Sequence, residues 1–255
     1  MKRSFGFKII FITIFFGNLL MGQISGMIIY KSDGTNVRAQ ISPANSIVTI
    51  DSIKFSDCVD ANGNVYNTVK IGTQWWMAEN LKSTKYRDGT DIPHVTDNSS
   101  WASLSTGAYC YHSNNAANAG TYGALYNWYA VNNHNVNANQ FLAPEGWHIA
   151  TKSEITTLIN YLGSSVAGKK LKSIDGWSPP GTDDVGFGAL PAGYREGGYG
   201  SFQFLGEHTL YWWPDDVTAT QTHYWHLSHL FDFVNSNAEN KKCGLSIRCV
   251  KDAAP

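Results

Sequence analysis

The sequence predicts an α+β domain of short antiparallel strands, two short helices and long loops. Three observations predict this class. Short apolar runs recur between glycines, an Asn-Gly pair separates two strand-like segments, and one clear amphipathic helix interrupts the strand-like pattern. So few helix signals among so many strand-like runs are typical of α+β domains.

The N-terminus, residues 1–22, has the features of a signal peptide. Lys2, Arg3 and Lys8 precede or open the apolar run IIFITIFFGNLLM, and Gly22 is a small residue suited to cleavage. The run is too short and too interrupted for a permanent membrane span. No cysteine lies near the cleavage region, so a lipoprotein anchor is disfavoured. We therefore expect a secreted or cell-surface protein with no membrane span in the mature chain.

Residues 23–57 contain short β-prone runs and are interpreted as an N-terminal extension or linker. Aromatic density rises from residue 58, so the main domain is placed at 58–252. Loss of the leader leaves 16 of the 19 basic side chains against 20 acidic ones. A surface with this balance has no electrostatic reason to bind nucleic acid or an anionic membrane.

Residues 60–81 carry the strongest hairpin signal. Asn62-Gly63 is a pair favoured in two-residue turns, and strand-prone residues flank it. Gly72 predicts a second turn before Trp75 and Trp76.

The clearest helix signal spans residues 151–163. Thr151 and Glu154 form a capping box, and Gly163 suits a left-handed C-terminal cap. Apolar residues recur with helical spacing, which predicts one buried stripe: Ile155, Leu158, Ile159 and Leu162. We expect this stripe to pack on a mixed β-sheet. Residues 122–131 are predicted to form a second, short buried helix.

The exported chain carries four cysteines: Cys58, Cys110, Cys243 and Cys249. An even number of cysteines outside the cytosol favours disulfides, although sequence cannot choose among the three pairings. Zinc is the weaker reading, because the close Cys-x-x-Cys pairs it favours are missing.

A histidine motif, H-x2-H-x2-H, spans His223, His226 and His229. On a strand, His223 and His229 would share one face and His226 would lie on the other, so the three would not gather around one ion. Half-buried strand histidines are the preferred interpretation, and no metal or cofactor is expected.

The nine tryptophans are the most informative composition feature. Trp75-Trp76 and Trp212-Trp213 are adjacent pairs, so the members of each pair point to opposite faces of a strand. Two interpretations remain open. One is an exposed aromatic platform for a sugar or a protein, and the other is a core that covers both sheet faces.

Several motifs together carry a family resemblance: DANGNVYNTVKIGTQWWMAENL, YGALYNWYAV, APEGWHIATKSE, GKKLKS, GFGALPAGYRE and CGLSIRCVKD. With these motifs, residues 58–252 resemble the Fibrobacter succinogenes major paralogous domain. The resemblance implies a C-type-lectin-like fold in an exported bacterial protein and supplies no catalytic residues. Family members often have cysteine where this chain has Ala143, and the calcium-dependent sugar motifs of C-type lectins are missing.

These observations favour a non-catalytic, exported binding or surface protein that recognises a glycan or another envelope protein, as in adhesion. The expected ligand contacts are Trp212, Trp213, Tyr194, Arg195 and Asp215. An alternative is an oxidase related to the formylglycine-generating enzymes, in which Cys243 and Cys249 would hold copper.

Overall fold

The computed structural model describes five stretches of the chain: residues 27–30, 36–39, 58–135, 139–216 and 218–253. They fall into two compact units that divide before Cys58. The predicted signal peptide, 1–22, and most of the predicted extension, 23–57, lie outside the described residues. In the first unit, β1 (Met27–Tyr30) pairs antiparallel with β2 (Asn36–Ala39).

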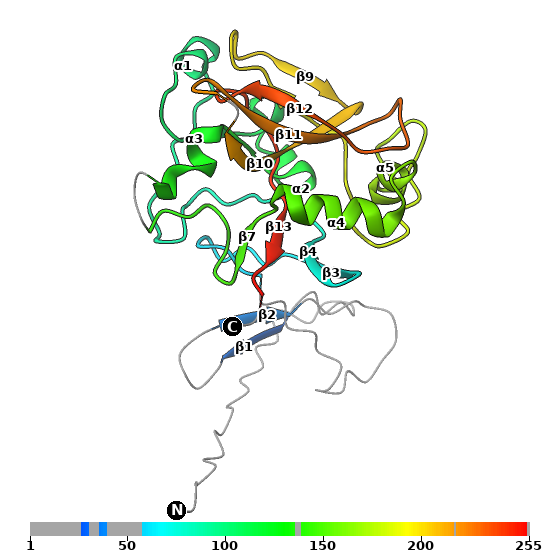
Figure 1. The fold of residues 1–255 in the computed structure, drawn as a ribbon. Helices are drawn as coiled ribbons and strands as arrows, with labels where there is room; N and C mark the ends of the chain where they lie inside the picture. The colour runs from blue at the N-terminus through cyan, green and yellow to red at the C-terminus, as the bar shows by residue number, and fades with distance from the viewer. Residues whose placement is uncertain (1–26, 31–35, 40–57, 136–138, 217, 254–255) are drawn as a thin grey trace, which may run out of the picture. The chain divides into compact units, whose positions relative to one another are not determined.

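The second unit is α+β, which confirms the predicted class (Figure 1). Its largest sheet has the strand order β12-β11-β10-β8-β9 and contains β8 (Ala192–Arg195), β9 (Phe202–Leu205), β10 (His208–Asp216), β11 (Gln221–Ser228) and β12 (Asn235–Asn240). A second sheet, β3-β4-β13-β7, contains β3 (Thr68–Ile71), β4 (Gln74–Met77), β7 (Trp147–Ile149) and β13 (Cys249–Lys251). A small third sheet pairs β5 (Tyr109–Cys110) with β6 (Leu125–Tyr126). Between these named strands, pairing is antiparallel except for that of β8 with β10.

The described residues include five α-helices where the sequence predicts two. They are α1 (Asn98–Ala102), α2 (Asn118–Tyr122), α3 (Trp128–Val131), α4 (Lys152–Leu162) and α5 (Ala167–Leu171). Four of them have only four or five residues, too few to repeat an apolar period. The segment predicted as one helix, 122–131, instead forms β6 followed by α3. Among the described residues, no helix combines the length and apolar character needed to cross a bilayer.

Helix α4 confirms the strongest local prediction. Thr151 is its N-cap, both hydrogen bonds of the capping box with Glu154 are present, and Gly163 follows at φ 90°. Ile155, Leu158 and Leu162 are buried, so the predicted apolar stripe does face the interior. Figure 1 shows α4 running alongside the large sheet, whose aromatic side chains meet this stripe in one core cluster.

The predicted turn at Asn62-Gly63 has a different form from the one expected. It is closed by a single bridge, Val59 with Val65, rather than by two strands. The Asp60 carboxylate accepts hydrogen bonds from the backbone N–H groups of Asn62 and Asn64, which satisfies donors that a strand ladder would otherwise use. The regular hairpin lies at the second predicted turn, where β3 and β4 flank Gly72.

Both faces of the β10–β11 ladder are buried. In the register, Trp212 lies opposite Tyr224, and this pair belongs to one core cluster. Tyr211 lies opposite Trp225, and this pair faces a second cluster together with Trp213. The tryptophan surplus is therefore used largely by the two-sided core, the second of the two interpretations left open by the sequence.

The predicted disulfides are absent: Cys58, Cys110, Cys243 and Cys249 form no disulfide in the structure. All four side chains are buried, and three of them pack in the same core cluster. Burial raises the pKa of the Cys110 thiol to about 12, against a partly offsetting effect of Arg195. The thiols thus act as small apolar core side chains.

Candidate functional site

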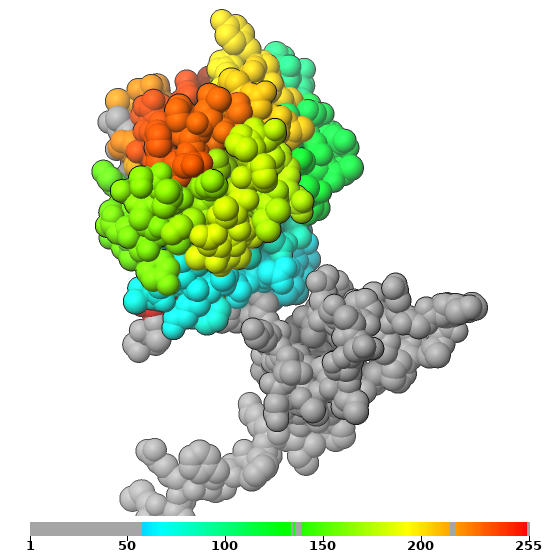
Figure 2. Space-filling view, turned by 90° about the vertical axis from the view of Figure 1, so that its right-hand side faces the viewer, coloured from blue at the N-terminus to red at the C-terminus, as the bar shows by residue number. Residues whose placement is uncertain are grey.

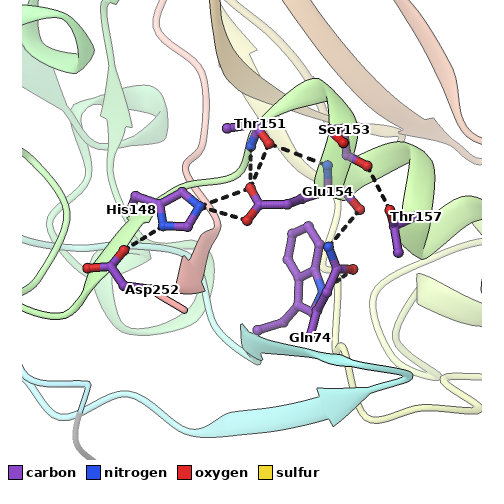
Figure 3. Close-up of polar contacts among 8 residues, drawn as sticks. Gln74, His148, Thr151, Ser153, Glu154, Thr157 and Asp252 are labelled. Carbon is purple, nitrogen blue, oxygen red and sulfur yellow. Dashed lines mark hydrogen bonds and ion pairs between the residues drawn. The ribbon is translucent and has the colours of Figure 1, made fainter. Parts of the chain in front are cut away.

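Two groups of side chains were candidates for a functional site, and the first surrounds the start of α4 (Figure 3). The His148 ring lies between two carboxylates. Its Nδ1 is 2.6 Å from Asp252 Oδ1, and its Nε2 is 2.8 Å from Glu154 Oε1. The Glu154 carboxylate also accepts hydrogen bonds from the Thr151 amide and hydroxyl.

This arrangement favours a structural role for His148. A ring with a carboxylate at each nitrogen donates from both, so it has no free lone pair to act as a base. The pKa of His148 is raised, chiefly by its hydrogen bond to Glu154 and against the effect of burial. The pKa of Glu154 is lowered, because these hydrogen bonds outweigh its burial. The network joins the chain after β13 to the start of α4.

The His148 network predicts a pH-dependent contribution to stability. Because the folded pKa of His148 is raised above 6.5, its stabilisation is complete below that value and is lost as pH rises through the folded pKa. His148 is partly exposed, so the effect should stay below about 1 kcal/mol. We expect the melting-temperature difference between wild type and His148→Gln to shrink between about pH 6 and about pH 9. A difference that stays constant across this range would contradict the assignment.

The second group is a continuous run of rings from β8, β9, β10 and the end of β11, here called the aromatic–histidine patch: Tyr194, Phe204, His208, His226 and His229. Tyr194 and Phe204 are stacked with centroids 6.1 Å apart, and Phe204 lies 4.7 Å from His208. The His208 ring in turn lies 6.0 Å from His226 and 5.8 Å from His229.

Strand register explains why these rings meet. His208 opens β10 and lies opposite Ser228. Because side chains alternate along a strand, His226, two residues before Ser228, shares the face of His208. The parallel bridge between Thr209 and Gly193 brings β8, and with it Tyr194, to the other side of β10.

Phe204 is the most unusual residue of the patch. Its side chain is 45% exposed, and its backbone has φ 56°. A bulky residue in this left-handed region costs on the order of 1–2 kcal/mol relative to glycine. Strain of this kind, held at an exposed aromatic side chain, makes Phe204 a candidate functional residue.

Three rings of the patch, those of Tyr194, His208 and His226, favour their neutral forms. Burial, followed by the proximity of His208, lowers the pKa of His226 to about 4. Burial and His229 also lower the pKa of His208. Burial and nearby acidic groups raise the pKa of Tyr194 to about 12. At neutral pH these three rings therefore present an amphipathic surface with no charge of their own.

The patch continues toward α5. The loop after His229 exposes Leu230 and Phe231, which are 65% and 43% exposed. The Lys172 ammonium anchors this loop, because it donates hydrogen bonds to the carbonyls of Ser228 and Phe231. Figure 2 shows the loop, in orange, on the surface beside the yellow-green segment that includes α5.

The ligand contacts predicted from sequence fall in different environments. Tyr194 lies in the patch and is half-buried. Trp212 and Trp213 are only 1% and 5% exposed, so neither offers an open stacking face. Asp215 belongs to β10.

Arg195 is fully buried and is a structural clamp in this fold. It donates hydrogen bonds to the carbonyls of Gly200, Val95 and Thr96 and to Asn98 Oδ1. Its guanidinium also lies 4.5 Å from the Trp101 ring centroid.

The predicted arrangement of the histidine motif is partly wrong. His223 and His226 are half-buried on β11, as expected, but the strand ends at Ser228. His229 therefore no longer follows the alternation of the strand, and its ring lies next to that of His208. His208 is a residue of another strand, which the sequence pattern did not single out. Phe204 and His208 were both missed. Residues 204–208, FLGEH, contain a turn signal between an aromatic and a histidine side chain. The sequence does not show that this segment lies next to β11, because that depends on the strand register.

Comparison with known proteins gives one family match. The model of the Fibrobacter succinogenes major domain matches residues 69–251. No curated protein and no solved structure matches the chain.

Proposed function

The chain belongs to the Fibrobacter succinogenes major domain family, and we propose that it is an exported, non-catalytic binding protein that recognises a glycan through the aromatic–histidine patch. Export is inferred from the leader sequence. The C-type-lectin-like assignment of the scaffold remains part of this proposal, and it is supported by the capped helix α4 that follows β7.

The observation that carries the proposal is the exposed position and strained backbone of Phe204. Its half-exposed ring is held by a strained backbone between Tyr194 and His208. Sugar-binding surfaces combine exposed aromatic faces with a few polar groups that fix orientation. Glu207, which is exposed beside His208, and the ring nitrogens of the histidines supply such polar groups.

The chemistry of the cysteines disfavours the oxidase alternative. Cys243 and Cys249 are both 0% exposed, and burial raises the pKa of each thiol well above its ordinary value. Redox-active cysteines are typically low-pKa thiols that solvent can reach, whereas these two thiols are buried and their pKa values are raised.

Two variants at one position test the proposal. Phe204→Ala and Phe204→Gly both remove the ring, so each should weaken glycan binding tenfold or more. Glycine tolerates the positive φ, so Phe204→Gly should be more stable than Phe204→Ala by about 1 kcal/mol. Binding would be measured on immobilised bacterial and plant cell-wall polysaccharides, and stability by urea unfolding.

Tyr199→Ala is the matched control, because Tyr199 is 84% exposed but is not part of the patch. It should bind as wild type does. Equal binding by wild type and Phe204→Ala would overturn the proposed surface. If wild type retains no polysaccharide but captures an envelope protein in a Phe204-dependent way, the ligand class is protein and the glycan proposal is wrong.

A further inference from the structure

A cluster of potential metal ligands lies at the exposed end of the aromatic–histidine patch. Glu207, His208 and His229 each offer one ligand atom, and these three atoms lie within 4.8 Å of one another. We propose that Glu207, His208 and His229 bind a divalent transition-metal ion, with Zn²⁺ as the best-suited cation. This inference rests on the ligand geometry and not on glycan binding, although the three residues belong to the surface proposed to bind the glycan.

The backbone brings the three residues together without help from the side chains. Glu207 and His208 are consecutive where β10 begins. His229 follows the last residue of β11, and its N–H donates a hydrogen bond of 2.9 Å to the Glu207 carbonyl. This bond follows the last β10–β11 pair and holds the start of β10 against the end of β11.

The distances suit coordination of one ion. With Zn–N bonds of about 2.0–2.1 Å, the centroids of two imidazoles on one ion lie about 5–6 Å apart. The His208 and His229 centroids are 5.8 Å apart. Ligand atoms around a tetrahedral zinc ion are about 3.3 Å apart. The three ligand atoms now lie within 4.8 Å of one another. Small rotations of the exposed Glu207 side chain and of the half-buried His208 and His229 side chains would bring these atoms to the spacing of a zinc site.

The hydrogen bonding of His229 also suits a ligand. Its Nδ1 lies 3.2 Å from the Glu207 carbonyl oxygen. A carbonyl only accepts, so Nδ1 is the donor of this pair and Nε2 is the ring nitrogen left for a metal ion. Metal-binding histidines are commonly oriented by such a hydrogen bond from the other ring nitrogen.

His226 provides a second, independent observation. Its Nε2 is buried without a hydrogen-bond partner, although its ring lies 6.0 Å from that of His208. His226 thus adds an unsatisfied buried ring nitrogen next to one of the proposed ligands, His208, and such a nitrogen requires an explanation. A water molecule in the fourth coordination position has the right chemistry to satisfy it.

The ligand set selects the class of cation. Two imidazoles and one carboxylate suit Zn²⁺, Cu²⁺ or Ni²⁺, whereas Ca²⁺ and Mg²⁺ prefer all-oxygen sites. Three protein ligands leave a coordination position open to water or to a ligand oxygen. The proposed ion would thus lie next to the exposed Phe204 ring.

Metal binding can be measured on the untagged full chain after treatment with EDTA. Titration with Zn²⁺ in a calorimeter should show one saturable site per chain. The variants His208→Gln and His229→Gln should each weaken Zn²⁺ binding at least tenfold. Co²⁺ would be used as a spectroscopic probe, and a strong visible absorption that both variants lose would report a four-coordinate site.

His223→Gln is the matched control, because His223 is half-buried on β11, the strand that ends just before His229, but packs against Trp213. It should leave Zn²⁺ binding unchanged. Circular dichroism would check that every variant is folded. The proposal is overturned if wild type shows no saturable Zn²⁺ binding, if the His208/His229 double variant binds as wild type does, or if His223→Gln loses binding equally.

Discussion

Replacing Arg248 with methionine is expected to lower the free energy of unfolding by about 3–5 kcal/mol. Arg248 is 1% exposed and donates to four acceptors: Asn80 Oδ1 and the carbonyls of Met77, Phe187 and Gly188. Methionine fills similar space but donates nothing, so these buried oxygens would lose their partner. Urea unfolding monitored by tryptophan fluorescence would measure the loss.

The expected effect is large because Arg248 connects segments that lie far apart in the sequence. Its acceptors come from β4, from the loop after β4 and from the segment before β8. Its guanidinium also lies 4.4 Å from the centroid of Phe187. Arg248, which lies just before β13, therefore joins the β3–β4 hairpin to the segment that precedes β8.

Two further variants make this result interpretable. Arg248→Lys keeps a charge but loses the planar fork, so it should restore only part of the stability. Asn80→Ala removes one acceptor of Arg248, together with the hydrogen bonds that Asn80 donates to Tyr122 and Ser246. It should cost about 1–3 kcal/mol, which keeps a measurement available if Arg248→Met does not fold. An Arg248→Met protein within about 1 kcal/mol of wild type would show that the clamp is dispensable.

Local signals in the sequence were reliable where a few neighbouring residues decide the structure. The capping box of Thr151 with Glu154 and the stripe that follows depend only on helix periodicity, and α4 forms as predicted. The turn at Gly72 depends only on the residues of one hairpin. At Asp60, in contrast, one side chain competes for the backbone donors and replaces a ladder by a closed loop.

Long-range pairing could not be predicted, and it decides the candidate site. Whether Trp212 and Trp213 are exposed depends on what covers both faces of β10, and helices and strands far apart in the chain provide that cover. His208 and His229 meet only because β10 and β11 pair in one particular register. The disulfide prediction failed for a related reason. The number of cysteines does not show where the fold will place them, and all four are buried in the core without forming a disulfide.

The Trp212 side chain provides the second large expected effect. Replacing it with alanine should lower the free energy of unfolding by about 3–5 kcal/mol, because the change leaves a cavity in the core. Trp212 is 1% exposed, its Nε1 donates a 2.8 Å hydrogen bond to the Tyr126 carbonyl, and its ring meets Trp128 edge to face at 5.8 Å. Urea unfolding would measure the loss.

Trp75→Ala is the appropriate comparison for Trp212→Ala, because Trp75 is 42% exposed in β4. It should cost about 1 kcal/mol or less, since much of the Trp75 ring is already in water. Folded Trp212→Ala protein should still retain polysaccharide, because the ring lies outside the aromatic–histidine patch. If Trp212→Ala instead keeps wild-type stability and loses the ligand, Trp212 contacts the ligand after all, and the binding surface lies on β10 rather than at Phe204.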